Sequence, residues 1–320
     1  RPIMIKTYKK LSIILILVTL FFHSCDNEDV STSNQVELFY KAFGVNPSPS
    51  PIKNKGVFFK DISYGKKSRN KLDILLPENS ELNGIVIFFH GGSFQRGDKA
   101  DIFDDFLTET IESILDNNIA LVSANYTFIN SSESSGVISA LKDGTSVISF
   151  IKKNSEILSL PKNKIILAGV SAGAGIAQWN GFRESSNNQI QGILALAAQS
   201  TYDLYQWKNI FQNFSLENLR MRFPDLEETY LNFYNGEPSK EDLKYLDYRS
   251  EMDSEDPPLY IYNPINSQDF INSEGNIDFN ILYHSFRHGD YLREKAINVK
   301  QEFSGAYQES PEQFILRLLN

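Results

Sequence analysis

The chain has 320 residues, enough for one large domain or two small ones. Hydrophobic residues make up 41% of it, which is ordinary for a globular protein with a sizeable core. Its formal net charge of −9 argues against a nucleic-acid-binding protein, because such proteins carry a basic patch.

The first 25 residues have the pattern of an export signal. Lys6, Lys9 and Lys10 form a positive stretch, an almost uninterrupted apolar run follows at 11–22, and a small-residue site ends at Cys25. The run is too short to span a bilayer comfortably, so we predict a signal peptide over 1–25 rather than an uncleaved membrane anchor.

Cys25 is the only cysteine, so no disulfide can form within the chain. Its place at the end of a signal resembles the lipidation site of a bacterial lipoprotein. The acidic residues at 26–29 resemble the segment that follows that site in lipoproteins of the Bacteroidetes type, and a solvated acidic linker is the alternative explanation. The resemblance implies an exported protein with a lipid anchor at the outer membrane, on its periplasmic or cell-surface face.

Residues 26–55 are predicted to be a tether, because they are rich in Ser, Asn and Pro after position 31. One apolar stretch within them, at 36–43, is expected to pack on the domain that follows.

From position 56 onward, predicted strands and helices alternate. Apolar runs predict strands at 57–64, 71–76, 84–89, 119–124, 164–168 and 191–198, with amphipathic helices at 101–116 and 137–153. Runs that are apolar throughout are typical of strands buried on both faces. The alternation predicts one α/β domain over 56–320, with a mainly parallel central sheet flanked by helices.

Residues 200–256 interrupt this alternation. They predict a helical, aromatic-rich, cap-like insertion after the sixth strand. The sheet resumes at 259–262, and we predict a last strand at 279–283 and a helix at 290–303. A final helix opens with Ser310 as N-cap and Pro311 as its first residue.

A Gly-Val-Ser-Ala-Gly pentapeptide at 169–173 stands between the strand at 164–168 and the start of a helix. Glycines on both sides of the serine allow a tight strand-to-helix turn that exposes its hydroxyl near a helix N-terminus. The turn favours a nucleophilic role for Ser171.

A glycine-rich segment, His-Gly-Gly-Ser-Phe at 90–94, follows the strand at 84–89. In a parallel sheet, ligands bind outside the carboxyl ends of the strands, so this segment and Ser171 are expected to meet there. Consecutive glycines leave backbone amides unshielded, which suits the negative oxygen of a tetrahedral intermediate. We predict an oxyanion hole made of the backbone N–H groups of Gly91, Gly92, Ser93 and Ala172.

A serine nucleophile needs a histidine to take its proton, and the chain has four histidines. His23 lies in the signal segment, and His90 is expected to support the glycine-rich loop. We predict that His288 is the general base, because it stands at a loop–helix boundary after the predicted last strand. His284 is the alternative, and is otherwise a structural histidine.

The acid that orients the histidine should follow the strand at 259–262. Asp269 is the nearest carboxylate there, and we predict that it is the acid. Asp203 and Glu274 are alternatives. An amide such as Asn266 is a further one, and it would stabilise the positive charge of the histidine less than a carboxylate does.

These motifs together resemble the α/β-hydrolase fold, and within it the esterase/lipase branch of carboxylesterases and hormone-sensitive-lipase-like enzymes. The likeness is greatest to secreted bacterial esterases of the bifunctional feruloyl and acetyl-xylan type. It covers 56–320 and rests on the segments 64–74, 90–98, 125–126, 140–143 and 256–259. At 263–264, where the family has His-Gly, this chain has Asn-Pro.

The motifs predict a serine hydrolase that cleaves carboxylic esters through an acyl-enzyme, with Ser171, His288 and Asp269 as its triad. The resemblance implies a small-molecule or polysaccharide-linked ester, for example of an acetylated or feruloylated polysaccharide. No cofactor or metal is expected. Two other functions fit the same residues: a serine peptidase or amidase, and a non-catalytic surface lipoprotein that binds a ligand through an inactive hydrolase fold.

Overall fold

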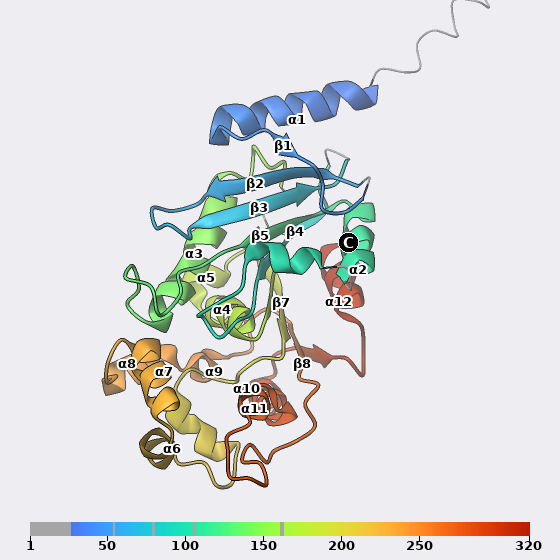
Figure 1. Ribbon diagram of the computed structural model, residues 1–320. Helices are drawn as coiled ribbons and strands as arrows, with labels where there is room; N and C mark the ends of the chain where they lie inside the picture. Colours follow the sequence, from blue (N-terminus) through green and yellow to red (C-terminus); the bar gives the residue numbers. More distant parts are fainter. Residues whose placement is uncertain (1–26, 54, 79–80, 105–106, 161–162) are drawn as a thin grey trace, which may run out of the picture.

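The computed structural model describes residues 27–320, apart from 54, 79–80, 105–106 and 161–162 (Figure 1). The signal peptide predicted at 1–25 and its Cys25 lie outside the described residues, so export and lipidation stay predictions. In the described part of the chain, no helix is both long and apolar enough to cross a membrane.

Nine strands of the described residues form one central sheet, in the order β1-β2-β3-β5-β4-β6-β7-β8-β9. The pairs β1·β2, β2·β3 and β3·β5 are antiparallel, and every pair from β5 to β9 is parallel. The mainly parallel sheet is therefore confirmed. The strands are β1 (Pro47–Ser48), β2 (Val57–Ser63), β3 (Lys71–Leu76), β4 (Gly84–Phe89), β5 (Ile119–Ala124), β6 (Ile165–Val170), β7 (Ile190–Leu196), β8 (Leu259–Tyr262) and β9 (Phe303–Gly305).

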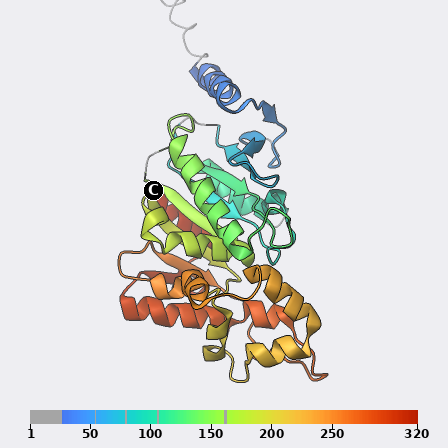
Figure 2. The same ribbon diagram turned by 90° about the vertical axis from the view of Figure 1, so that its left-hand side faces the viewer.

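Helices cover both faces of the sheet (Figures 1 and 2). Two of them, α2 (Thr108–Asp116) and α12 (Pro311–Leu319), pack on one face, and α12 carries the predicted Ser310 cap. The other face is covered by α3 (Val137–Lys153), α4 (Ala172–Gly181) and α11 (Phe286–Val299). Shorter helices are η1 (Lys99–Phe103) and α5 (Glu184–Asn187).

The register of the central strands places the expected site. Phe89, at the end of β4, pairs with Ala124 of β5 and with Gly169 of β6. The carboxyl ends of these three strands therefore lie at one edge. The glycine-rich segment and Ser171 follow β4 and β6 at that edge, as predicted from the topology.

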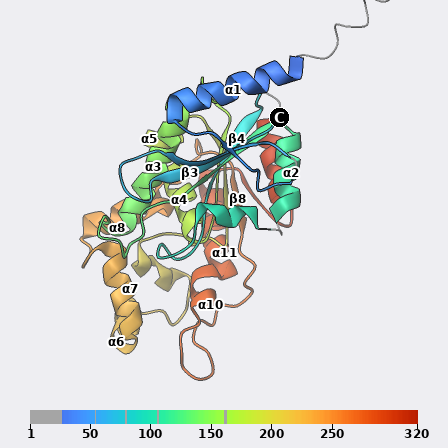
Figure 3. The same ribbon diagram turned by 45° about the horizontal axis from the view of Figure 1, so that its top comes forward.

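The segment predicted as a tether is partly folded. Helix α1 (Asn27–Phe43) lies beside β2 at one end of the molecule (Figure 3), and β1 pairs with β2. Phe39 is fully buried, and its ring stacks on that of Phe59 with 4.0 Å between the centroids. The packing expected for 36–43 is therefore confirmed. The described part of the predicted tether at 26–55 is not a free linker, because Phe39 and Ile52 are buried in the core.

The helical insertion predicted at 200–256 is present. It consists of η3 (Leu204–Asn209), α6 (Leu216–Arg222), α7 (Pro224–Tyr234), α8 (Lys240–Leu246) and α9 (Tyr248–Glu251). With α10 (Phe279–His284), these helices lie at the end of the molecule away from α1 (Figures 1 and 2). Side chains of the insertion form a separate apolar cluster with Leu282 of α10.

The strand predicted at 279–283 is wrong, because this segment forms α10. Its five residues fit a strand or a helical turn equally well, and periodicity alone cannot distinguish the two over so short a run. Asp278 caps α10, since its carboxylate accepts a hydrogen bond from the N–H of Ile281. The last strand is instead β9, whose first residue, Phe303, is the final residue of the helix predicted at 290–303.

Candidate active site

Ser171 stands on the sharp turn between β6 and α4, as predicted. Its backbone angles are φ 53° and ψ −117°, a strained conformation for a residue with a side chain. A Cβ atom on Gly169 would lie 2.3 Å from the carbonyl carbon of Gly173, and one on Gly173 would lie 2.0 Å from the carbonyl oxygen of Phe89. Only glycine at these two positions lets the strands and the helix approach so closely.

The glycine-rich loop passes directly beside Ser171. A Cβ atom on Gly91 would lie 3.5 Å from the Cβ of Ser171. Gly92 has a φ of +113°, which turns the loop, and Ser93 also has a positive φ. Among the described residues, the N–H groups of Gly92, Ser93 and Ala172 have no protein acceptor. These three amides are therefore available to a ligand.

Buried polar groups hold the loop in place. His90 is fully buried, and its Nδ1 lies 2.6 Å from the carbonyl oxygen of Gly91. The hydroxyl of Tyr126 donates to the carbonyl oxygen of His90 at 2.9 Å, and the guanidinium of Arg69 donates to that of Gly97 at 3.1 Å. His90 thus supports the loop, as its position in the sequence indicated.

The histidine that contacts Ser171 is His284, with 2.9 Å between Ser171 Oγ and His284 Nε2. His284 is the last residue of α10. Asn263, the first residue after β8, donates from its Nδ2 to the carbonyl oxygens of His284 at 3.3 Å and of Ala198 at 2.8 Å. This amide ties the end of α10 to the carboxyl edge of the sheet.

His288, the predicted base, has a different environment. Its side chain is completely buried, and the N–H of Ser200 donates to its Nδ1 at 3.2 Å. Its Nε2 therefore carries the proton and donates to the carbonyl oxygen of Leu282 at 2.9 Å. Burial lowers the pKa of His288 to about 4. Both nitrogens are occupied, so the structure corrects the prediction that His288 is the partner of Ser171.

The predicted acids do not contact His284 either. Its Nδ1 lies 2.8 Å from the side-chain oxygen Oδ1 of Asn280, four residues earlier on α10. An amide oxygen can only accept, so Nδ1 donates, and Nε2 is left to accept the proton of Ser171. The residues predicted for this role lie elsewhere: Asp269, Glu274 and Asn266 are exposed, and Asp203 caps η3.

The electrostatic setting of His284 follows from these neighbours. Burial lowers the pKa of His284 below its usual value. The imidazole is therefore neutral at pH 7, which is the form that accepts a proton.

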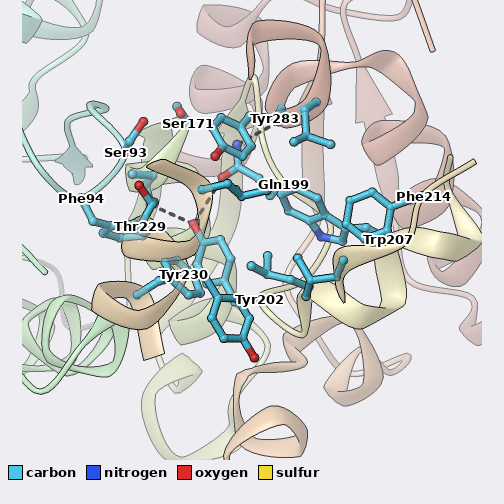
Figure 4. Close-up of a pocket in the computed structure, with 16 residues that line it drawn as sticks. Ser93, Phe94, Ser171, Gln199, Tyr202, Trp207, Phe214, Thr229, Tyr230 and Tyr283 are labelled. Carbon is cyan, nitrogen blue, oxygen red and sulfur yellow. Dashed lines mark hydrogen bonds between the residues drawn. The ribbon is translucent and has the colours of Figure 1, made fainter. Parts of the chain in front are cut away.

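A largely apolar pocket opens beside Ser171 (Figure 4). Its cavity volume is about 80 Å³, and it opens toward solvent. Ser93 and Ser171 lie at one side, and Trp207 and Phe214 of the insertion lie at the other. Its aromatic lining consists of Phe94, Tyr202, Trp207, Phe214, Tyr230, Phe233 and Tyr283. Of the described residues that line it, none is charged.

Comparison with known proteins agrees with this geometry. The sequence model of the BD-FAE family matches residues 72–262, more than half of the chain. The chain belongs to the BD-FAE family. This places it among the esterases of the α/β-hydrolase fold, as the sequence motifs indicated.

One curated relative of this BD-FAE chain is the isoprenylcysteine alpha-carbonyl methylesterase of Arabidopsis thaliana, 26% identical over 187 residues. The match covers 54% of this chain and 42% of the relative, so the chain spans less than half of that protein's length.

Two solved structures share the fold. A truncated carbohydrate esterase from gut microbiota has a TM-score of 0.59 at 11% identity, over 85% of this chain and 99% of the other. Esterase 2 of Thermogutta terrifontis, phosphonylated by sarin, has a TM-score of 0.54 at 15% identity. That match covers 85% of this chain and 93% of the other.

The BD-FAE match includes the glycine-rich loop and Ser171 but ends at β8. His284 and Asn280 lie beyond it, which is why the motifs located the serine and not its partners. In a strand, residues 280 and 284 would be about 13 Å apart, whereas one turn of helix brings them to about 6 Å. The one signal in the sequence that could have paired them is Asp278, because an aspartate in the N-cap position predicts a helix that starts at 279.

Proposed function

We propose that this protein is a serine hydrolase that cleaves carboxylic esters through an acyl-enzyme. The observation that carries the proposal is the 2.9 Å contact between Ser171 Oγ and His284 Nε2, on a strained strand-to-helix turn beside an apolar pocket. Such a pair is the activated nucleophile of serine hydrolases. The names of the relatives, which are all esterases, support the ester class.

The reaction proceeds in two halves. Ser171 Oγ attacks the ester carbonyl while its proton passes to His284 Nε2, and the amides of Gly92, Ser93 and Ala172 bind the resulting oxyanion. When the ester C–O bond breaks, His284 gives that proton to the departing alcohol. Water then attacks the acyl-enzyme, with His284 again taking and returning a proton, which releases the acid and restores Ser171.

The apolar pocket takes the acyl group, and its lack of charged lining residues predicts a preference for uncharged acyl chains. Burying an unpaired carboxylate there would be costly. We expect kcat/KM for p-nitrophenyl hexanoate to exceed that for the p-nitrophenyl monoester of adipic acid by about 100-fold, or about 2.7 kcal/mol.

The same assay tests the proposed function, with hexanoyl p-nitroanilide as the amide control. If the protein hydrolysed neither of the two esters, the proposal of a serine esterase would be contradicted. Faster hydrolysis of the anilide than of the esters would favour an amidase. Equal rates for the two esters would leave the esterase activity supported, but would show that the acyl group does not bind in this pocket.

Gly92→Ala is expected to impair the oxyanion site. A Cβ atom there would lie 2.1 Å from the carbonyl oxygen of Arg96, so the loop must shift and its amides with it. Loss of one oxyanion donor typically reduces kcat by about 10²–10³-fold, and we expect a reduction of about 10²-fold at nearly unchanged KM.

Gly236→Ala is the matched control, because Gly236 has a φ of +112° but no atom within 4 Å of its Cβ position. Both variants should lose about 1–2 kcal/mol of unfolding free energy from the strained backbone. Only Gly92→Ala should lose kcat. Equal kcat in the two variants would exclude an oxyanion role for this loop.

A further inference from the structure

We propose that Asn280 is the positioning residue of the catalytic histidine, an amide on α10 that contacts the histidine in place of a carboxylate. The inference rests on the proposed function and concerns the same site. Asn280 Oδ1 lies 2.8 Å from His284 Nδ1, on the side of the ring opposite to the contact with Ser171. The three side chains form a continuous Ser-His-Asn chain of hydrogen bonds.

The helix sets the geometry of this arrangement. Asn280 and His284 are separated by one turn of α10, which places their side chains on the same face. Asp278 caps the beginning of the helix, and Asn263 binds the carbonyl oxygen of His284 at its end. A hydrogen bond within one capped turn therefore fixes both the orientation of the imidazole and the nitrogen that carries its proton.

Among the residues that the structure describes, the groups in contact with His284 carry no negative charge. Ser171 and Asn280 are neutral, and the ring of Tyr283 lies with its centroid 6.4 Å from that of His284. His288 is held neutral by burial. Asp278, the carboxylate on the same helix, is engaged at the helix cap. An amide orients the imidazole but does not stabilise its cation as a carboxylate would.

The lack of a negative charge beside His284 affects how kcat/KM depends on pH. The base form of His284 is the neutral form, so kcat/KM falls as the pH decreases through the pKa of His284. With an amide partner that pKa stays below the usual value of a histidine, and activity persists on the acid side of pH 6.5. A carboxylate at position 280 would raise the pKa and move this acid limb to higher pH.

The test uses Asn280→Asp and Asn280→Ala in the full chain, with p-nitrophenyl butyrate as substrate. We expect Asn280→Asp to shift the acid limb of kcat/KM upward by about one pH unit and to raise kcat on the plateau about tenfold, because the imidazolium gains a counter-charge. We expect Asn280→Ala to lower kcat at least tenfold with little change in KM.

Asn266→Asp is the matched control, since it adds the same charge at an exposed amide that does not contact His284. Melting temperatures establish that each variant is folded. A pH profile of Asn280→Asp that coincides with those of wild type and the control would overturn the inference, as would an unchanged kcat in Asn280→Ala. If the wild-type protein hydrolyses no ester, the proposed function fails instead.

Discussion

Ser171→Ala is expected to reduce kcat/KM for p-nitrophenyl butyrate by about 10⁴-fold or more. In the proposed mechanism this hydroxyl forms the acyl-enzyme, and the other hydroxyls of the pocket lack a histidine partner among the described residues. Residual hydrolysis would come only from the oxyanion amides and substrate binding. The melting temperature should stay close to that of wild type, because alanine fills the same turn with one atom fewer.

Thr229→Ala is the control for this variant. It removes another hydroxyl from the same pocket, one without a part in the proposed reaction. We expect it to change kcat/KM by less than tenfold. If Ser171→Ala were as active as Thr229→Ala, the serine mechanism would have to be abandoned.

The second large loss of activity is expected from substitution of His284, whereas substitution of the neighbouring His288 should mainly lower stability. His284→Ala removes the base and should lower kcat about 10⁴-fold without lowering the melting temperature much, because the side chain is only partly buried. Purified variants compared by ester hydrolysis and thermal melting provide both numbers.

His288→Ala should show the reverse pattern. It leaves the buried N–H of Ser200 and carbonyl oxygen of Leu282 without their partner, at a cost of about 1–3 kcal/mol each. We expect a melting temperature lower by several degrees and measurable hydrolysis. Loss of hydrolysis in a folded His288→Ala, together with an active His284→Ala, would restore the prediction made from the sequence.

Some parts of the candidate site could be predicted from the sequence, whereas the choice between His284 and His288 could not. The turn at Ser171 depends on glycines that allow a close approach of strand and helix, and the loop depends on the positive φ of Gly92, so local sequence encodes both. The buried strands β4 and β5 are continuous apolar runs, and the parallel topology brings their carboxyl ends together. These features made the positions of Ser171 and of the glycine-rich loop predictable.

The partners of Ser171 depend on a different kind of information. His284 and Asn280 pair only because 279–284 is a helix, and a segment of six residues is too short for its periodicity to distinguish a helix from a strand. The choice between His284 and His288 depends further on burial, which sequence position does not reveal. The same holds for α1, where burial of Phe39 against Phe59 converts a predicted tether into part of the fold.

We infer that Ser171 is a nucleophile activated by His284. The most direct test of this inference is to treat the purified protein with an alkyl fluorophosphonate, which forms a covalent adduct with activated serines, and to locate the adduct by peptide mass spectrometry. We predict one adduct per chain, on Ser171, lost in His284→Ala and retained in His288→Ala. An adduct on another serine, or none on the folded wild-type protein, would contradict the account.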